Sequence, residues 1–259
     1  MEKNIFNTTK VIHFFLFAPM LILIMFGVVF VSKHTSLFSF ISHGKVLYTR
    51  EDNVYSKEKT EEKEEIKKDY NKVLFVGDIM LGRYVEKLML LHGEKYPFEK
   101  VSSFLKGYTV IGNLEGPIPL THRSTVNGGM LFSFPNTTPR ILKENAIAAV
   151  SLANNHAYDQ GESGYENTKT VLDKEGVGHF GGYSTTASDS FVTKVSDIPV
   201  VIYGVTMIST TWNKDEAYKT TEKLRKENKD AILIAFVHWG DEYFSHQGDA
   251  QKEFAHTLI

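Results

Sequence analysis

The sequence contains no cysteine. This absence excludes disulfide-bonded scaffolds, cysteine nucleophiles and thiolate metal sites. The sequence also has little net charge: 29 Lys and Arg residues nearly balance 31 Asp and Glu residues, which gives a formal net charge of −2. This near-balance argues against a nucleic-acid-binding protein that depends on bulk positive charge. A hydrophobic fraction of 42% is ample for a packed core, so wholesale disorder is excluded as well.

A long apolar run lies near the N-terminus. Residues 11–31 read VIHFFLFAPMLILIMFGVVFV, with no polar or charged side chain from Phe14 onward. At about 1.5 Å per residue the run is roughly 31 Å long, which matches the hydrocarbon core of a bilayer. It is longer than the apolar region of a cleaved signal peptide, and no A-x-A site follows it. We therefore predict a short tail at 1–10 and one transmembrane anchor at 11–31, with a signal peptide as the alternative.

A charged segment follows the apolar run. Between Lys57 and Asp69 only Thr60 and Ile66 are uncharged, so no apolar face is present to pack against a core. We expect 32–72 to be a charged, flexible spacer, with a docking tail for a basic partner as the alternative. Positive charges flank the apolar run almost equally. Because the first ones lie in a very short N-terminal tail, we expect the N-terminus on the cytoplasmic side of the membrane. The prediction is a single-pass protein of the cell membrane with an extracellular folded domain.

From residue 73 onward, short apolar runs alternate with amphipathic helical patterns. The apolar runs are 73–76, 108–111, 148–152, 199–205 and 231–237, and the clearest helical patterns are 164–175 and 215–228. This alternation predicts an α/β fold in which mixed sheet layers are flanked by helices. We expect the folded domain to cover 73–259.

Four of these runs end on polar residues that can bind a metal ion or a phosphate. They are Asp78, then Asn113 with Glu115, then Asn155 with His156, and finally His238. Because ligands bind outside the carboxyl ends of the strands in α/β sheets, we expect these side chains to meet at one edge. Carboxylate, amide and imidazole groups suit divalent ions such as Mn, Fe or Zn. A pair of such ions can activate water and hold a phosphoryl group, so the residues alone predict a phosphoesterase-like site.

Four sequence blocks together resemble one family. VGDIMLGR (76–83), GNLEGPI (112–118), SLANNHAYDQG (151–161) and HWGDEY (238–243) resemble, in this order, the CapA-type capsule-biosynthesis proteins. That family is associated with making or exporting poly-γ-glutamate, and its fold is related to that of calcineurin-like metallophosphoesterases. The resemblance implies a metallophosphoesterase-like domain in a membrane-anchored component of this synthesis or export. The implied partners are the membrane, other capsule-synthesis membrane subunits and an anionic polymer substrate.

Two other interpretations of the function stay open. One is a metal-dependent phosphoesterase-type hydrolase that acts outside the membrane, which makes enzymatic activity an open question. The other is a fragment that has an intact anchor and no stable domain. Thermal melting separates the fragment from the capsule component and the hydrolase, because a fragment lacks a cooperative unfolding transition.

The resemblance also implies roles for individual residues. The implied ligands of the divalent ions are Asp78, Asn113, Glu115, Asn155 and His238. His156 would face the substrate as a proton donor or charge stabiliser, and Asp159 would orient the imidazole ring. Arg83 would anchor a carboxylate or a phosphate through its planar guanidinium, with a surface salt bridge as the alternative.

The sequence departs from the pattern at two places. Met80 stands where the phosphoesterase Asp-x-His motif has its histidine, so one nitrogen ligand is absent. Family members also continue past the helix that begins near Ala250 into a GxHPHxxQ block, whereas this sequence ends at Ile259. We therefore expect the domain to be incomplete at its C-terminus. Outside the blocks, His92, His122 and His179 are expected in loops or at the surface, and 121–134 is a candidate flap over the site.

Overall fold

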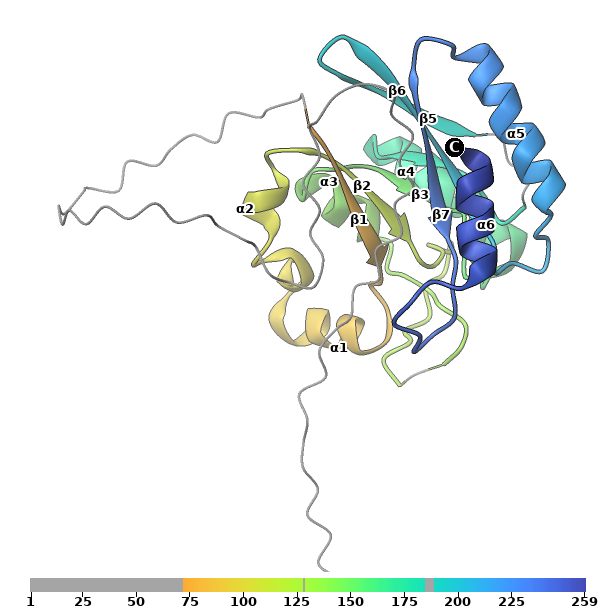
Figure 1. Cartoon of the computed structure of the whole chain (residues 1–259). Coiled ribbons are helices and arrows are strands. Elements are labelled where there is room, and N and C mark those ends of the chain that lie inside the picture. Colours follow the sequence, from red (N-terminus) through yellow and green to blue (C-terminus); the bar gives the residue numbers. More distant parts are fainter. Residues whose placement is uncertain (1–71, 128, 185–188) are drawn as a thin grey trace, which may run out of the picture.

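The computed structural model describes residues 72–127, 129–184 and 189–259 (Figure 1). The predicted tail, the predicted anchor at 11–31 and the predicted spacer up to residue 71 lie outside these residues. Among the residues that are described, none of the helices combines the length and apolar character needed to cross a bilayer.

The first sheet has four parallel strands in the order β1-β2-β3-β4. Its strands are β1 (Val73–Ile79), β2 (Thr109–Leu114), β3 (Ile147–Ser151) and β4 (Gly178–Phe180). The connections contain α1 (Arg83–His92), η1 (Tyr96–Phe98), α2 (Ser102–Leu105), α3 (Thr138–Glu144) and α4 (Gly161–Glu175). Because all four strands run the same way, their carboxyl ends share one edge of the sheet.

The second sheet has three strands in the order β5-β6-β7. These strands are β5 (Ser190–Val195), β6 (Ile198–Thr206) and β7 (Ile232–His238). β5 and β6 form an antiparallel hairpin, whereas β6 and β7 are parallel and are connected through α5 (Lys214–Glu227). Helix α6 (Asp249–Leu258) follows β7.

The apolar side chains form three layers of packing, which define a helix–sheet–sheet–helix sandwich. On β6, Val201 and Tyr203 pack beneath α5 and α6, whereas the alternate residue Ile202 packs with Ile111 of β2 between the sheets. Leu142 of α3 belongs to the layer that covers the outer face of the first sheet. Figure 1 shows α5 and α6 on the outer side of the second sheet. Both faces of the inner strands are covered, which explains why β2, β3, β6 and β7 are mostly apolar.

One side chain anchors the C-terminal helix. Phe254 of α6 is 1% exposed. Its ring stacks on Tyr218 of α5 at 5.5 Å between centroids. It also makes edge contacts with Trp212 at 5.2 Å and Trp239 at 6.3 Å. Phe254 therefore ties α6 to α5 and to the loops at the ends of β6 and β7.

The predicted α/β class is confirmed, and the five predicted apolar strands are present. β1 and β2 extend further than predicted, because Asp78 and Asn113 are still paired across the two strands. β4 and β5 were not predicted. β4 has only three residues, and β5 carries exposed polar residues between partly buried ones, so neither forms an apolar run long enough to detect.

Candidate metal-binding site

The site lies where the carboxyl edges of the two sheets meet. Asp78 on β1, Glu115 just after β2 and His238 at the end of β7 each offer one ligand atom, and these atoms lie within 4.8 Å of one another. Asp78 and Asn113 are paired in neighbouring parallel strands, so their side chains emerge next to each other. His238 belongs to the second sheet. Packing of one sheet on the other is therefore what assembles the site.

A hydrogen-bond network fixes the orientation of Asn113. The Asn154 side-chain oxygen accepts the His156 backbone N–H at 3.0 Å, so its Nδ2 must be the donor on the other side. Asn154 Nδ2 donates to Leu114 O at 2.9 Å and to Asn113 Oδ1 at 3.0 Å. Asn113 consequently turns its Nδ2 toward Asp78 Oδ1, at 2.8 Å. In this arrangement Asn113 supports Asp78 and does not offer an oxygen to the site.

His238 contacts four of the residues around it. Its Nε2 lies 3.0 Å from Asn155 Oδ1 and 3.8 Å from Glu115 Oε1. Its Nδ1 lies 3.6 Å from Asp78 Oδ1 and 3.4 Å from Asn113 Nδ2. The imidazole therefore stands between the two carboxylates, and the structure brings together all five residues for which the sequence predicted metal binding. The ligand roles of Asp78, Glu115, Asn155 and His238 stay predictions, whereas Asn113 presents its Nδ2 donor to Asp78 in this arrangement.

The two carboxyl groups of the site have opposite pKa shifts. Burial, together with the negative charge of Asp78, raises the pKa of Glu115 to about 7. Burial also tends to raise the pKa of Asp78, but hydrogen bonds from His238 and Asn113 and the charge of His238 outweigh it and lower that pKa. Two carboxylates in one partly buried site repel each other, so one of them keeps a proton near neutral pH.

The donor set fits a divalent cation. Two carboxylates, one imidazole and the Asn155 amide oxygen give the mixed nitrogen and oxygen coordination that Mn, Fe or Zn accept. A cation here would replace the proton that Glu115 retains and would remove the repulsion between Glu115 and Asp78. We therefore assign Asp78, Glu115, Asn155 and His238 as the residues able to hold such an ion.

We expect the metal-free chain to lose stability as the pH rises from 5 to 8. Glu115 has a pKa of about 7 when folded and an ordinary value of 4.5, so the folded state binds more protons between these values. Its contribution falls by on the order of 3 kcal/mol across this window. Urea unfolding in the presence of a chelator, followed by tryptophan fluorescence, measures the change. Glu115→Gln should remove this loss, and equal pH dependence in both proteins would contradict the assignment.

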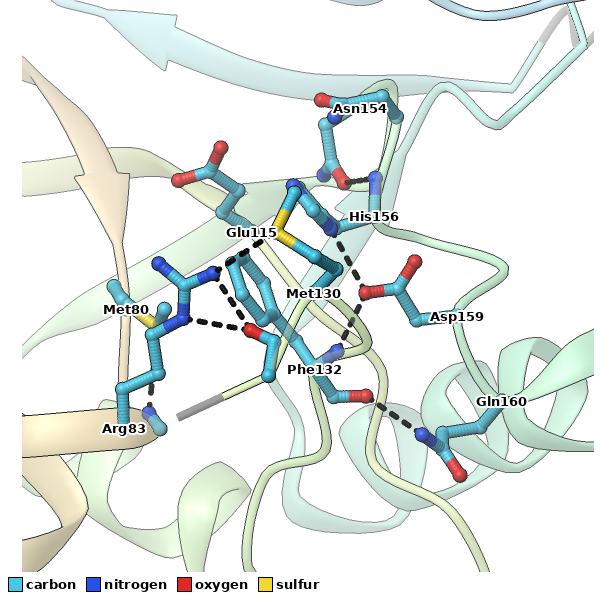
Figure 2. Close-up of polar contacts among 12 residues, drawn as sticks. Met80, Arg83, Glu115, Met130, Phe132, Asn154, His156, Asp159 and Gln160 are labelled. Carbon is cyan, nitrogen blue, oxygen red and sulfur yellow. Dashed lines mark hydrogen bonds and ion pairs between the residues drawn. The ribbon is translucent and has the colours of Figure 1, made fainter. Parts of the chain in front are cut away.

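His156 lies beside the metal-ligand cluster and is held by two contacts (Figure 2). Its Nδ1 is 2.8 Å from Asp159 Oδ2, and its ring stacks on the Phe132 ring at 3.9 Å between centroids. The same Asp159 oxygen accepts the Phe132 backbone N–H, while Gln160 Nε2 donates to Phe132 O at 2.9 Å. The predicted orientation of His156 by Asp159 is therefore present in the geometry, and Phe132 is an additional partner.

Arg83 lies on the other side of Phe132 from His156 (Figure 2). Its guanidinium carbon is 4.5 Å from the Phe132 ring centroid, and its Nη2 donates to Gly129 O at 2.7 Å. The backbone of Arg83 has a positive φ of 53°, which is uncommon for a residue with a side chain. Its N–H is tied to Thr125 Oγ1 at 2.8 Å. The structure places Arg83 against Phe132, with part of its guanidinium engaged by the 121–134 segment, and its role as a ligand anchor stays a prediction.

A buried polar cluster holds the 121–134 segment against α1. Glu86 is almost fully buried and accepts hydrogen bonds from the Thr125 backbone N–H at 2.9 Å and from His122 Nε2 at 2.8 Å. His122 Nδ1 is 2.8 Å from Ser133 Oγ. His122 is a loop residue, as expected, with the added role of joining the two ends of this segment. The segment reaches the site through Phe132.

Sequence reasoning did not assign roles to Asn154 or Phe132. Asn154 stands inside the Asn-Asn-His block, and its full burial is a property of the folded chain that its residue type does not indicate. Phe132 lies in the candidate flap, where an aromatic residue has no periodic pattern to identify it. Both act through contacts with residues distant in sequence.

The fold and the site define an α/β sandwich protein with a candidate divalent-metal site at the edge where its sheets meet. Residues 72–259 match the model of the family described as "Bacterial capsule synthesis protein PGA_cap". The chain belongs to this family, and the predicted resemblance to CapA-type capsule proteins is confirmed.

Two curated relatives share this similarity. The chain is 26% identical to "Capsule biosynthesis protein CapA" of Bacillus anthracis, over 71% of this chain and 50% of the relative. It is 27% identical to "PGA biosynthesis protein CapA" of Bacillus subtilis (strain 168), over 71% of this chain and 53% of the relative. The chain thus spans about half the length of the curated relatives that it matches. A crystal structure of a hypothetical protein from Thermus thermophilus aligns with a TM-score of 0.44 and 18% identity, covering 72% of this chain and 62% of that one.

Proposed function

We propose that the chain is a membrane-anchored component of poly-γ-glutamate capsule synthesis or export and that it holds a divalent cation. Membership of the capsule synthesis family supports the role in capsule biosynthesis. The apolar run at 11–31 supports the membrane anchor. The proposed ligands of the cation are Asp78, Glu115, Asn155 and His238.

The observation that carries the metal site is the convergence of Asp78, Glu115 and His238. Their ligand atoms lie within 4.8 Å of one another although Asp78 lies on β1, Glu115 follows β2 and His238 lies on β7. Burial and mutual repulsion raise the pKa of Glu115 to about 7, so the site stabilises an added positive charge. A divalent ion bound there would supply a Lewis acid that attracts carboxylate or phosphate oxygens.

The neighbouring residues suit an anionic polymer. The Arg83 guanidinium and the His156 imidazole both lie against the Phe132 ring beside the cluster. An arginine fork and an imidazole bind carboxylates, and a chain of glutamate units carries one carboxylate per unit. We propose that these two side chains bind polymer carboxylates next to the cation, and that other membrane subunits of capsule synthesis provide the remaining functions.

A hydrolase is the second candidate, and the His156–Asp159 pair favours it. A carboxylate at 2.8 Å from Nδ1 leaves Nε2 to deliver a proton to a leaving group, which is the arrangement that general acid catalysis needs. In this alternative a bound ion would supply a Lewis acid for the phosphoester, a water would attack the phosphorus, and His156 Nε2 would give its proton to the leaving oxygen. The two candidates share the metal site and differ in whether a bond is broken.

Asp78→Ala tests the site that both candidates share, and a cleavage assay with His156→Ala separates the two candidates. We expect Asp78→Ala to reduce capsular polymer in a strain that depends on this chain by about tenfold or more, because a carboxylate that binds the ion directly is lost. The assembly role predicts no Mn²⁺-dependent cleavage of bis-p-nitrophenyl phosphate by the full chain. The hydrolase predicts turnover that His156→Ala lowers by about 10²-fold or more.

The control for both measurements is Asp249→Ala, which removes a fully exposed carboxylate at the start of α6. It should leave polymer yield and any turnover unchanged. Wild-type polymer levels in the Asp78→Ala strain, with the variant protein present at normal abundance, would contradict the proposed function.

A further inference from the structure

The last residue of β6 carries a buried hydroxyl without a partner. Thr206 is 1% exposed, and its Oγ1 makes no hydrogen bond to any of the residues that the structure describes. Nearly all buried side-chain hydroxyls in folded proteins are hydrogen-bonded, so an unpaired one calls for a specific explanation. Oγ1 has one donor and two acceptor positions available.

The pairing of β6 with β7 places this hydroxyl beside the metal-ligand cluster. Thr206 is the register partner of His238 in two parallel strands, and partners in adjacent strands present their side chains on the same face. That face is the one between the two sheets. Ile202 lies on the same face of β6 as Thr206, Phe236 lies on the same face of β7 as His238, and both pack between the sheets. The His238 side chain reaches Asn155 and Asp78 from this face.

The residue two positions earlier shows what this face packs against. A Cβ added at Gly204 would lie 2.8 Å from Ala153 Cβ and 3.0 Å from Ser151 Oγ. The face of β6 is therefore in close contact with the end of β3 and with the segment that continues into Asn154 and Asn155. Thr206 lies one side-chain repeat further toward the carboxyl edge, beside His238 in the neighbouring strand.

We propose that Thr206 is a further ligand-contacting residue of this site, and that its hydroxyl donates a hydrogen bond to an oxygen held by the cation beside His238. This proposal rests on the proposed cation site. The oxygen belongs either to a metal-bound water or to a carboxylate of the polymer, and both are strong acceptors for a hydroxyl donor. A bound ligand would supply the partner that Thr206 lacks among the described residues of the protein.

Thr206→Val in the full chain tests the proposal, because valine keeps the shape and removes the hydroxyl. We expect the variant to bind Mn²⁺, or a short γ-glutamate oligomer in the presence of Mn²⁺, about tenfold more weakly by calorimetry. Thr206→Ser should retain binding. The metal-free Thr206→Val protein should have an unchanged or higher Tm, by up to about 2–4 °C, because an unpaired buried hydroxyl has been removed.

Thr138 provides the matched control. It lies in the first turn of α3, is 0% exposed and has an Oγ1 that is equally unpartnered among the described residues, but it is not part of the cluster. Thr138→Val should show the same unchanged or raised Tm without any loss of Mn²⁺ or oligomer binding. The pair of variants thus separates removal of a buried hydroxyl in general from removal of a ligand contact.

Each outcome decides the question. If Mn²⁺ without oligomer binds more weakly, the acceptor is a metal-bound water. If Mn²⁺ binds normally and the oligomer binds more weakly, the acceptor is a polymer carboxylate. Wild-type affinity for both probes in Thr206→Val overturns the role of Thr206 and leaves the cation site intact. A lower Tm of the metal-free variant also overturns it, since the hydroxyl would then have a partner inside the protein. Failure of the wild type to bind either probe overturns the cation site and this proposal together.

Discussion

Replacement of His238 by alanine is expected to weaken Mn²⁺ binding by the full chain at least about 100-fold, because loss of a direct ligand costs more than loss of its supporting contacts. His238 is the only one of the four proposed ligands that comes from the second sheet, and it stands between Asp78 and Glu115. Without it the remaining proposed ligands all come from the first sheet and its loops. The expected result is therefore a near-complete loss of binding.

Isothermal titration with Mn²⁺ measures this loss. His256→Ala is the matched control, because it removes an exposed imidazole from the last turn of α6. Binding by His256→Ala should equal that of the wild type. Wild-type affinity in a folded His238→Ala protein would show that the cluster does not hold the ion.

Replacement of Phe254 by alanine is expected to lower the free energy of unfolding by about 3–5 kcal/mol, which is typical for a fully buried phenylalanine. Phe254 is 1% exposed and contacts Trp212, Tyr218 and Trp239, so truncation leaves a cavity lined by three large rings. These rings cannot collapse into the space without leaving their own contacts in α5 and the loops. The expected result is a large loss of stability that is centred on α6.

Circular dichroism in urea is the suitable measurement, because Trp212 and Trp239 lie against the mutated side chain and their fluorescence changes with it. Phe104→Ala on α2 is the control, since Phe104 is 51% exposed, and its replacement should change stability by no more than about 0.5 kcal/mol. A similarly small effect of Phe254→Ala would mean that α6 contributes little to the fold.

The sequence allowed prediction of the elements that depend on local pattern. The segments that become β1, β2, β3, β6 and β7 are predominantly apolar, and their apolar side chains pack in the core clusters on both sides of the sheets. Their parallel arrangement follows from alternation with helices. The convergence of Asp78, Glu115 and His238 was therefore foreseeable from the rule that ligands lie at the carboxyl edge.

The remaining features depend on contacts that no local pattern encodes. The orientation of Asn113 follows from three hydrogen bonds of Asn154, which lies 41 positions away. The position of Phe132 follows from side chains of Asp159 and Gln160 that reach its backbone. Among the residues that the structure describes, the Thr206 hydroxyl has no hydrogen-bond partner. Its position beside His238 follows from the register of β6 and β7, which the sequence pattern does not give.

A single oxygen atom of Asp159 links Phe132 to His156. This oxygen accepts the backbone N–H of Phe132 and also contacts Nδ1 of His156. Any outward movement of Phe132 removes the stacking surface of the imidazole and changes the charge environment that aligns it. The backbone position of Phe132 and the orientation of the His156 imidazole are therefore coupled through one carboxylate oxygen, so a substitution that displaces either residue is expected to disturb the other.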